Sequence, residues 1–83
     1  MNPSKTVHIQ YYAILREERG LKEETCVTQV RTAENLFNEL KEKFHFRLPM
    51  NALRVSINGQ FSDWQTTIQD QDKIVFIPPV AGG

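Results

Sequence analysis

Apolar residues recur at every second position in the segment 5–12. This period of two is typical of a β-strand, whose successive side chains point to opposite faces of a sheet. One face carries Val7, Ile9 and Tyr11, and the other carries His8, Gln10 and Tyr12. The segments 53–58 and 73–77 alternate in the same way, and the segment 24–30 is rich in β-branched residues, so we expect strands there as well.

A longer segment, 33–45, has its apolar residues at helical spacing instead. The expected buried stripe consists of Ala33, Leu36, Phe37, Leu40 and Phe44. Thr32 is a suitable N-cap for this helix, because its hydroxyl can accept a hydrogen bond from a free backbone N–H. The segment 13–19 consists of good helix formers and is followed by Gly20, which predicts a short helix with a left-handed C-terminal residue.

The order of these elements predicts the fold. Asn58-Gly59 is a strong hairpin signal, and we expect a short strand to return from it over residues 61–64. One main helix can cover one face of one sheet. We therefore expect an α+β fold with one mixed sheet of about five strands and the helix packed across it. This is the β-grasp arrangement of ubiquitin-like proteins, here predicted for residues 1–77, with an extended tail over residues 78–83.

Length, charge and cysteine content exclude several classes of function. A chain of 83 residues forms one domain with a modest core and no deep active site of its own. Its zero net charge argues against nucleic acid and anionic membranes as partners. The single cysteine excludes an internal disulfide and suits a reducing compartment. No long apolar run or signal peptide is present, so we expect a soluble, cytoplasmic domain.

The residues capable of catalysis or metal binding favour structural roles. His8 lies on a predicted strand, and His45 lies at a helix C-terminus, where partial positive charge complements the helix dipole. Cys26 lies within a strand and follows acidic residues, which do not activate a thiol. Asp70 and Asp72 lack the spacing of a metal-binding loop and are typical of a solvated turn. We expect neither a metal nor a bound cofactor.

The C-terminus is the most unusual part of the sequence. Half of the four prolines and half of the four glycines lie in the last six positions. Pro78 and Pro79 lack the N–H groups that a sheet needs, so we expect the last strand to stop before them and continue as a stiff, extended stem. Val80 and Ala81 then lead to Gly82 and Gly83, which have no side chains. Such a slender end fits a narrow site in another protein, although small residues are also common at frayed termini.

Alternation also predicts an apolar patch beside this tail. If the face with Ile74 and Phe76 packs under the helix, Val75 and Ile77 point away from it. Tyr12 shares that outer face, and Phe61 joins it after the hairpin turn. A contiguous apolar patch marks a partner surface, and the chain is too short to supply much cover for it.

These features resemble one known family, the small sulfur-carrying subunits of molybdopterin synthase (the MoaD family). The resemblance covers nearly the whole chain. It rests on the segment 11–17 (YYAILRE), the turn 57–59 (ING) and, above all, the ending 77–83 (IPPVAGG). A related sulfur carrier of thiazole synthesis shares the fold and the Gly-Gly ending, but usually lacks the double proline and the YYAxxRE segment.

The resemblance implies a function for the tail. In this family a ubiquitin-activating-like adenylyltransferase uses ATP to adenylate the terminal glycine, here Gly83, and a sulfur donor converts it to a thiocarboxylate. The tail enters the large synthase subunit, and its sulfur goes to cyclic pyranopterin monophosphate to form the molybdopterin dithiolene. The small subunit is a sulfur donor, and the catalytic groups belong to the large subunit. The usual assembly is a heterotetramer, with two small subunits at the ends of a large-subunit dimer.

The resemblance also assigns Tyr12, Phe61 and Ile77 to the partner surface, in agreement with the alternation. The other residues expected to bind partners are Val75, Pro78, Pro79, Val80, Ala81 and Gly82. One departure concerns the turn before the last strand, where the family often has Asp-Gly-Asp and this chain has Gln71 between two aspartates. If position 71 has a positive φ, Gln71 is strained by about 1 kcal/mol.

Two other functions remain open. A ubiquitin-like protein modifier would conjugate Gly83 to lysines, and a sulfur carrier could serve another pathway such as thiazole synthesis. A plain interaction domain with an incidental tail is a further alternative.

Overall fold

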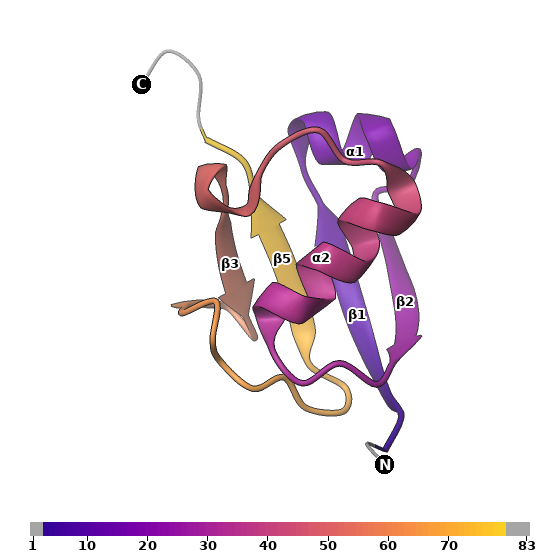
Figure 1. Ribbon diagram of the computed structural model, residues 1–83, viewed down its shortest axis with the longest axis vertical. Coiled ribbons are helices and arrows are strands. Elements are labelled where there is room, and N and C mark those ends of the chain that lie inside the picture. The colour runs from indigo at the N-terminus through magenta and orange to yellow at the C-terminus, as the bar shows by residue number, and fades with distance from the viewer. Residues whose placement is uncertain (1–2, 80–83) are drawn as a thin grey trace.

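The computed structural model describes residues 3–79, and its strands form one mixed five-stranded sheet in the order β2-β1-β5-β3-β4 (Figure 1). The central strands β1 and β5 run parallel, whereas the neighbours β2, β3 and β4 pair antiparallel. The elements are β1 (Lys5–Tyr11), α1 (Ala13–Arg19), β2 (Glu23–Thr28), α2 (Ala33–Phe44), the 3-10 helix η1 (Met50–Ala52), β3 (Arg54–Ile57), β4 (Gln60–Ser62) and β5 (Lys73–Ile77).

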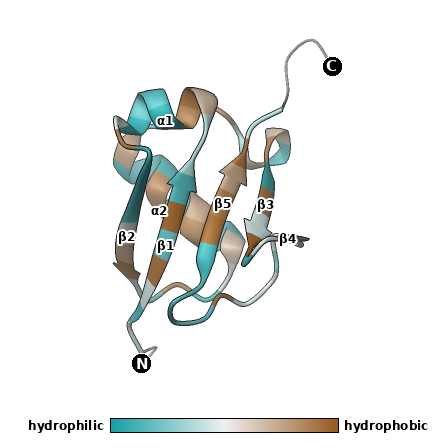
Figure 2. Ribbon diagram, turned by 180° about the vertical axis from the view of Figure 1, so that it is seen from behind, coloured by the Kyte–Doolittle hydropathy of each residue, from teal (hydrophilic) through white to brown (hydrophobic). Residues whose placement is uncertain are grey.

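The helix α2 crosses one face of this sheet (Figure 1), and the view from behind shows the sheet in front of α2 (Figure 2). This is the expected α+β, ubiquitin-like β-grasp arrangement. The helix begins as predicted, since the Thr32 hydroxyl accepts a hydrogen bond from the Asn35 backbone N–H at 3.2 Å. In the part of the chain that the structure describes, no helix is both long and apolar enough to cross a membrane.

The core lies between α2 and the inner face of the sheet. Phe37 on α2 contacts Phe76 on β5, with ring centroids 5.3 Å apart, and Trp64 stacks on the same Phe76 at 6.0 Å. Alternation predicts the buried members of β1 and β5 correctly. The core residues on β1, α2 and β5 are Val7, Ile9, Tyr11, Ala33, Leu36, Phe37, Leu40, Ile74 and Phe76.

The structure differs from the sequence prediction where α2 ends. Phe44, expected on the buried stripe, is only half-buried, and Phe46 is buried in its place. The cause is His45, whose left-handed φ of 58° ends the helix. Once the helical period is interrupted, the side-chain directions no longer follow it, and Phe46 contacts Tyr11 and Phe37. The 3-10 helix η1 was also not expected.

The turns have the backbone conformations that their residues suggest. Gly20 ends α1 with a φ of 77°, and Asn58 and Gly59 have φ values of 53° and 87°, as a tight hairpin requires. Gln71 has a φ of 71°, so the expected strain at this position is present. Asp70 and Asp72 beside it bind backbone N–H groups of Thr6 and Gln69.

Candidate partner-binding surface beside the C-terminal tail

The strand β5 ends at Ile77, as expected from the prolines that follow it. Pro78 is buried against the fold, whereas Pro79 is exposed. Pro78 is therefore packed against the fold, and Pro79 is the first exposed residue of the predicted stem. The remaining tail residues of the predicted site, Val80, Ala81, Gly82 and Gly83, lie outside the described residues.

The outer face of β5 carries the predicted apolar side chains. Val75 and Ile77 are half-buried there, while Ile74 and Phe76 on the inner face are fully buried. Across the sheet, Ser56 pairs with Val75 on one side and with Phe61 on the other. The β-sheet register thus places Phe61 on the same face as Val75, two strands away.

Phe61 is the most prominent member of this surface, with 65% of its area exposed. Tyr12 is 45% exposed and follows Tyr11, which pairs with Phe76, so it lies at the same end of the sheet as Ile77. We call Tyr12, Phe61, Val75 and Ile77 the tail-base patch. A groove lies beside it, lined among others by Ala52, Leu53, Phe61, Ile77, Pro78 and Pro79.

The backbone beside Tyr12 is strained. Ala13 begins α1 with a φ of 51°, a left-handed conformation that costs a non-glycine residue about 1–2 kcal/mol. The Tyr12 carbonyl accepts hydrogen bonds from the Leu15 and Arg16 backbone N–H groups at 3.1 and 3.4 Å. This sharp turn carries the chain from β1 into α1 and leaves the Tyr12 side chain exposed.

A polar network on the other side of the sheet holds α1 in place. Glu24 on β2 accepts two hydrogen bonds from Arg19, at 2.7 and 2.8 Å, and one from the Tyr11 hydroxyl at 2.7 Å. The Arg19 guanidinium also lies 4.0 Å from the centroid of the Phe44 ring. The network therefore ties the end of α1 to β2, β1 and the last turn of α2.

We call this network of Glu24, Arg19 and Tyr11 the α1 lock, because its electrostatics favour a structural role. Its hydrogen bonds from Arg19, and then from Tyr11, hold the pKa of Glu24 below its usual value despite partial burial. Burial, and then the hydrogen bond to Glu24, raise the pKa of Tyr11 well above that of a free phenol. Glu24 thus stays ionised and Tyr11 stays neutral at neutral pH. The YYAxxRE segment did not indicate this lock because Arg19 and Glu24 lie beyond it.

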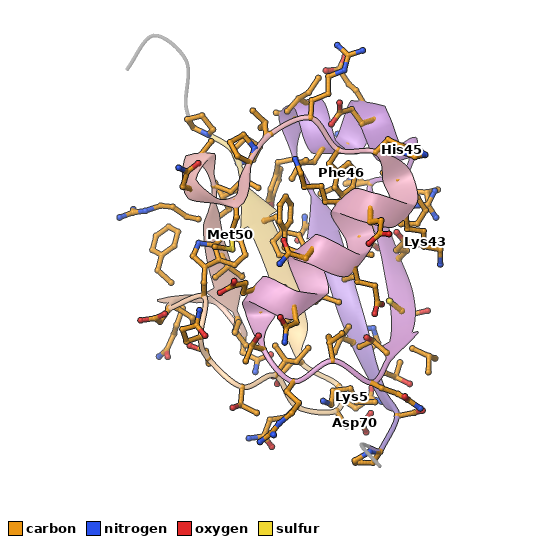
Figure 3. The ribbon with its side chains drawn as sticks, viewed as in Figure 1. Lys5, Lys43, His45, Phe46, Met50 and Asp70 are labelled. Carbon is orange, nitrogen blue, oxygen red and sulfur yellow. The ribbon has the colours of Figure 1, made fainter. Side chains whose placement is uncertain are left out.

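The other chemically capable residues lie apart from the tail-base patch. Asp70 lies near Lys5 at the opposite end of the molecule from His45 (Figure 3). His8 is exposed, with its Nε2 atom 3.0 Å from Gln71 Oε1. Burial, and then the carboxylates of Glu39 and Glu24, raise the pKa of Cys26, which disfavours the reactive thiolate. Within residues 3–79, no three His, Cys, Asp or Glu side chains gather in a geometry able to hold a metal ion.

Sequence reasoning missed one residue of the outer face, Arg54. It pairs with Ile77 across the sheet, and its guanidinium carbon lies 4.9 Å from the centroid of the Phe61 ring. The alternation of the segment 53–58 already assigned Arg54 to the outer face, because its neighbour Val55 belongs to the other face of the strand. Only the β3–β5 register, which a single sequence does not reveal, brings it beside Ile77.

Comparisons with known proteins agree with this architecture. A molybdopterin synthase sulfur carrier subunit from Mycobacterium tuberculosis is 29% identical over 80 residues, which cover 93% of this chain and 96% of that protein. The structure of small archaeal modifier protein 1 from Methanosarcina acetivorans is 21% identical and superposes with a TM-score of 0.77, covering 99% of this chain and all of the other.

A chain from a complex of subunits 1 and 2 of the molybdopterin-converting factor from Helicobacter pylori is 24% identical, with a TM-score of 0.63. That similarity covers 94% of this chain and 99% of the other. At such identities the two solved structures show a common fold. The match to the ThiS family is more informative, because it extends over residues 9–83 and so includes the tail. The chain is a member of the ThiS family.

Proposed function

We propose that this chain is the sulfur carrier of a molybdopterin synthase, with Gly83 as the residue that carries the sulfur. The observation that carries the proposal is the position of β5. The strand leads from the centre of the sheet directly to Pro78 and Pro79, beside the exposed tail-base patch. The near full-length similarity to a molybdopterin synthase sulfur carrier subunit supports the choice of pathway.

The chemistry proposed for the tail needs an activated carboxylate. A carboxylate resists nucleophilic attack, so a ubiquitin-activating-like adenylyltransferase first joins the Gly83 carboxylate to the α-phosphate of ATP, and pyrophosphate leaves. Hydrosulfide, as the sulfur donor, then attacks the carbonyl carbon and displaces AMP, so that a new C–S bond replaces the C–O bond to the phosphate and gives the thiocarboxylate. This is the logic of covalent catalysis, in which a poor leaving group is exchanged for a good one.

The thiocarboxylate is then delivered to a second protein. The absence of a Cβ atom at Gly82 and Gly83 allows close approach to the catalytic groups of that partner. The proline stem reduces the conformational entropy lost on insertion. We propose the synthase large subunit as this partner, with cyclic pyranopterin monophosphate as sulfur acceptor, and two small subunits on each large-subunit dimer. The Helicobacter pylori relative, described as a complex of subunits 1 and 2, supports a partner of this kind.

Within this proposal the chain supplies no catalytic side chain. Its parts are the tail, residues 78–83, and the tail-base patch that positions the tail on the large subunit. Pro78 is buried against the fold and anchors the start of the tail. ATP is a substrate of the activating enzyme, and we assign no bound cofactor to this chain.

Mass spectrometry of the intact protein tests the proposal. The chain is incubated with the activating enzyme of the same organism, ATP and a sulfur donor, and we expect the exchange of one oxygen for sulfur at Gly83. Added large subunit and cyclic pyranopterin monophosphate should then give molybdopterin and regenerate the carboxylate. The control is a chain lacking Gly83, which keeps the whole described fold. Failure of the full chain to gain sulfur would overturn the proposal.

A sulfur carrier for another pathway is the second candidate, and the ThiS family match favours it because it includes the tail without specifying the acceptor. This candidate gains sulfur in the same experiment but does not transfer it to cyclic pyranopterin monophosphate. A protein modifier would instead give higher-mass lysine conjugates in cell lysates, and these would disappear when Gly83 is deleted.

A further inference from the structure

Arg54 places a positive charge within the otherwise apolar surface at the base of the tail. It is exposed, it lies across the sheet from Ile77, and it lines the groove formed with Phe61, Pro78 and Pro79. A partner that covers the tail-base patch must therefore cover or contact this guanidinium as well.

The Phe61 ring holds the guanidinium in place. The distance of 4.9 Å between the Arg54 Cζ atom and the ring centroid is within the range of a cation–π contact. This contact uses the guanidinium carbon and leaves the N–H edges unoccupied. Among the described residues, the Arg54 side chain makes no hydrogen bond and no ion pair.

One acidic residue of the same chain could in principle have paired with it. Val55 pairs with Ser62 across the β3–β4 hairpin, so Asp63 would lie opposite Arg54 if the pairing continued by one residue. Instead β4 ends at Ser62, and the Asp63 carboxylate accepts a hydrogen bond from the Gln65 backbone N–H at 2.9 Å. It serves the turn after β4, so no carboxylate among residues 3–79 compensates the charge of Arg54.

We infer that the partner surface which covers the tail-base patch presents a carboxylate to Arg54, and that this ion pair selects the partner. The inference rests on the proposed function and takes the synthase large subunit as the partner. Arg54 is then a specificity-determining residue, distinct from the apolar members of the patch.

The physical reason is the cost of burying an unpaired charge. Covering a guanidinium without an acceptor strongly opposes association, so an apolar partner surface alone would be rejected. A carboxylate matches the planar, forked arrangement of the guanidinium N–H groups and can accept two hydrogen bonds at once. A neutral acceptor would meet part of the hydrogen-bonding need but would leave the charge uncompensated.

The test is the affinity of the full chain for the purified large subunit of the same organism, measured by calorimetry at low and high salt. We expect Arg54→Glu to weaken binding at least 30-fold, as charge reversal at a buried ion pair commonly does, and Arg54→Met to weaken it about tenfold. Arg54→Lys should retain intermediate affinity, because it keeps the charge but loses the fork. High salt should weaken the wild-type complex more than the Arg54→Met complex.

Two further variants make the result specific. Arg31→Glu changes the net charge by the same amount on an exposed loop residue before α2, far from the tail, and should bind like the wild type. Asp63→Asn tests the intramolecular alternative and should also bind like the wild type. On the large subunit, replacing the proposed carboxylate partner of Arg54 by lysine should restore the binding of Arg54→Glu.

Two outcomes overturn the inference while leaving the proposed function intact. One is an Arg54→Glu chain that binds as well as Arg31→Glu. The other is weakened binding that no single charge reversal on the large subunit restores. If the wild-type chain itself neither gains sulfur nor binds the large subunit, the proposed function fails and the inference fails with it. Unfolding curves of each variant show whether lost binding reflects lost folding.

Discussion

The two faces of β5 differ in burial, and their residues alternate along the five positions of this strand. Ile74 and Phe76 face α2 and are fully buried, whereas Val75 and Ile77 face outward and stay half-buried. The inner face is closed by contacts within the chain. Among residues 3–79, no helix lies across the outer face, which is turned toward the viewer in Figure 2. The comparison separates a face of β5 that stabilises the fold from the face that we propose for partner recognition.

The largest expected effect is on the inner face. Phe76→Ala should lower the free energy of unfolding by about 3–5 kcal/mol, because it removes a fully buried ring that contacts both Phe37 and Trp64. Urea unfolding followed by circular dichroism measures this change. A loss below about 1 kcal/mol would show that the inner face does not dominate stability.

The matched change on the outer face is Phe61→Ala. Because the ring is 65% exposed, we expect its loss to change the free energy of unfolding by less than about 1 kcal/mol. Binding to the large subunit should weaken by about 2 kcal/mol, or roughly 30-fold, if the ring is an interface hot spot. Calorimetry and urea unfolding of the same sample separate the two effects. Equal losses in both measurements would remove the distinction between the faces.

A third prediction concerns the lock between α1 and the inner side of the sheet. Glu24→Gln replaces a carboxylate that accepts hydrogen bonds from both Arg19 and Tyr11, and should cost about 1 kcal/mol at pH 7. The pKa of Glu24 is lowered in the folded state. Its contribution is therefore fully present above the unfolded pKa, about 4.3, and is lost as the pH falls through the folded value.

The measurement is the urea midpoint of the wild type and of Glu24→Gln across this pH range. The difference between the two proteins should shrink below pH 4, because the wild-type carboxylate is then being protonated. Thr25→Val is a matched control on the exposed side of β2 and should leave the pH dependence unchanged. A difference that stays constant with pH would show that the Glu24 charge contributes nothing to stability.

The smallest expected effect is at Gln71, at the far end of β5 from the tail. Gln71→Gly should relieve the left-handed strain at a φ of 71° and stabilise the protein by at most about 1 kcal/mol. The loss of the exposed contact with His8 offsets part of this gain. Thermal unfolding measures the change, and large-subunit binding should remain as in the wild type. A marked loss of stability would show that the side-chain contact outweighs the backbone strain.

The sequence was sufficient to predict most of the fold. Period-two alternation assigned the inner residues of β1 and β5, and Thr32, Gly20 and Asn58-Gly59 marked the element boundaries with their own chemistry. These features succeed because each depends on neighbours within a few residues. The bounds of β5 agree with the predicted segment because proline cannot continue the sheet.

The failures involve either a local backbone conformation that the residue type does not determine or contacts between distant segments. Phe46 is buried only because His45 adopts a left-handed conformation, which is uncommon for a residue other than glycine. Arg54 meets Ile77 through a strand register that the sequence does not specify. Trp64, expected at the end of the strand that returns from the Asn58-Gly59 hairpin, instead lies beyond β4 and stacks on Phe76. Of the predicted site, the structure locates Tyr12, Phe61, Val75, Ile77, Pro78 and Pro79, while their roles in binding stay a prediction.

The central place of β5 also has a mechanical consequence. Because β1 and β3 flank it on both sides, a force that pulls on the tail is carried along two rows of backbone hydrogen bonds at once. Hydrogen bonds loaded along the strand direction share the load, unlike those at a free sheet edge, which can open one after another. We expect a tail attached in this way to withstand repeated withdrawal from tight-fitting sites without unravelling the domain that carries it.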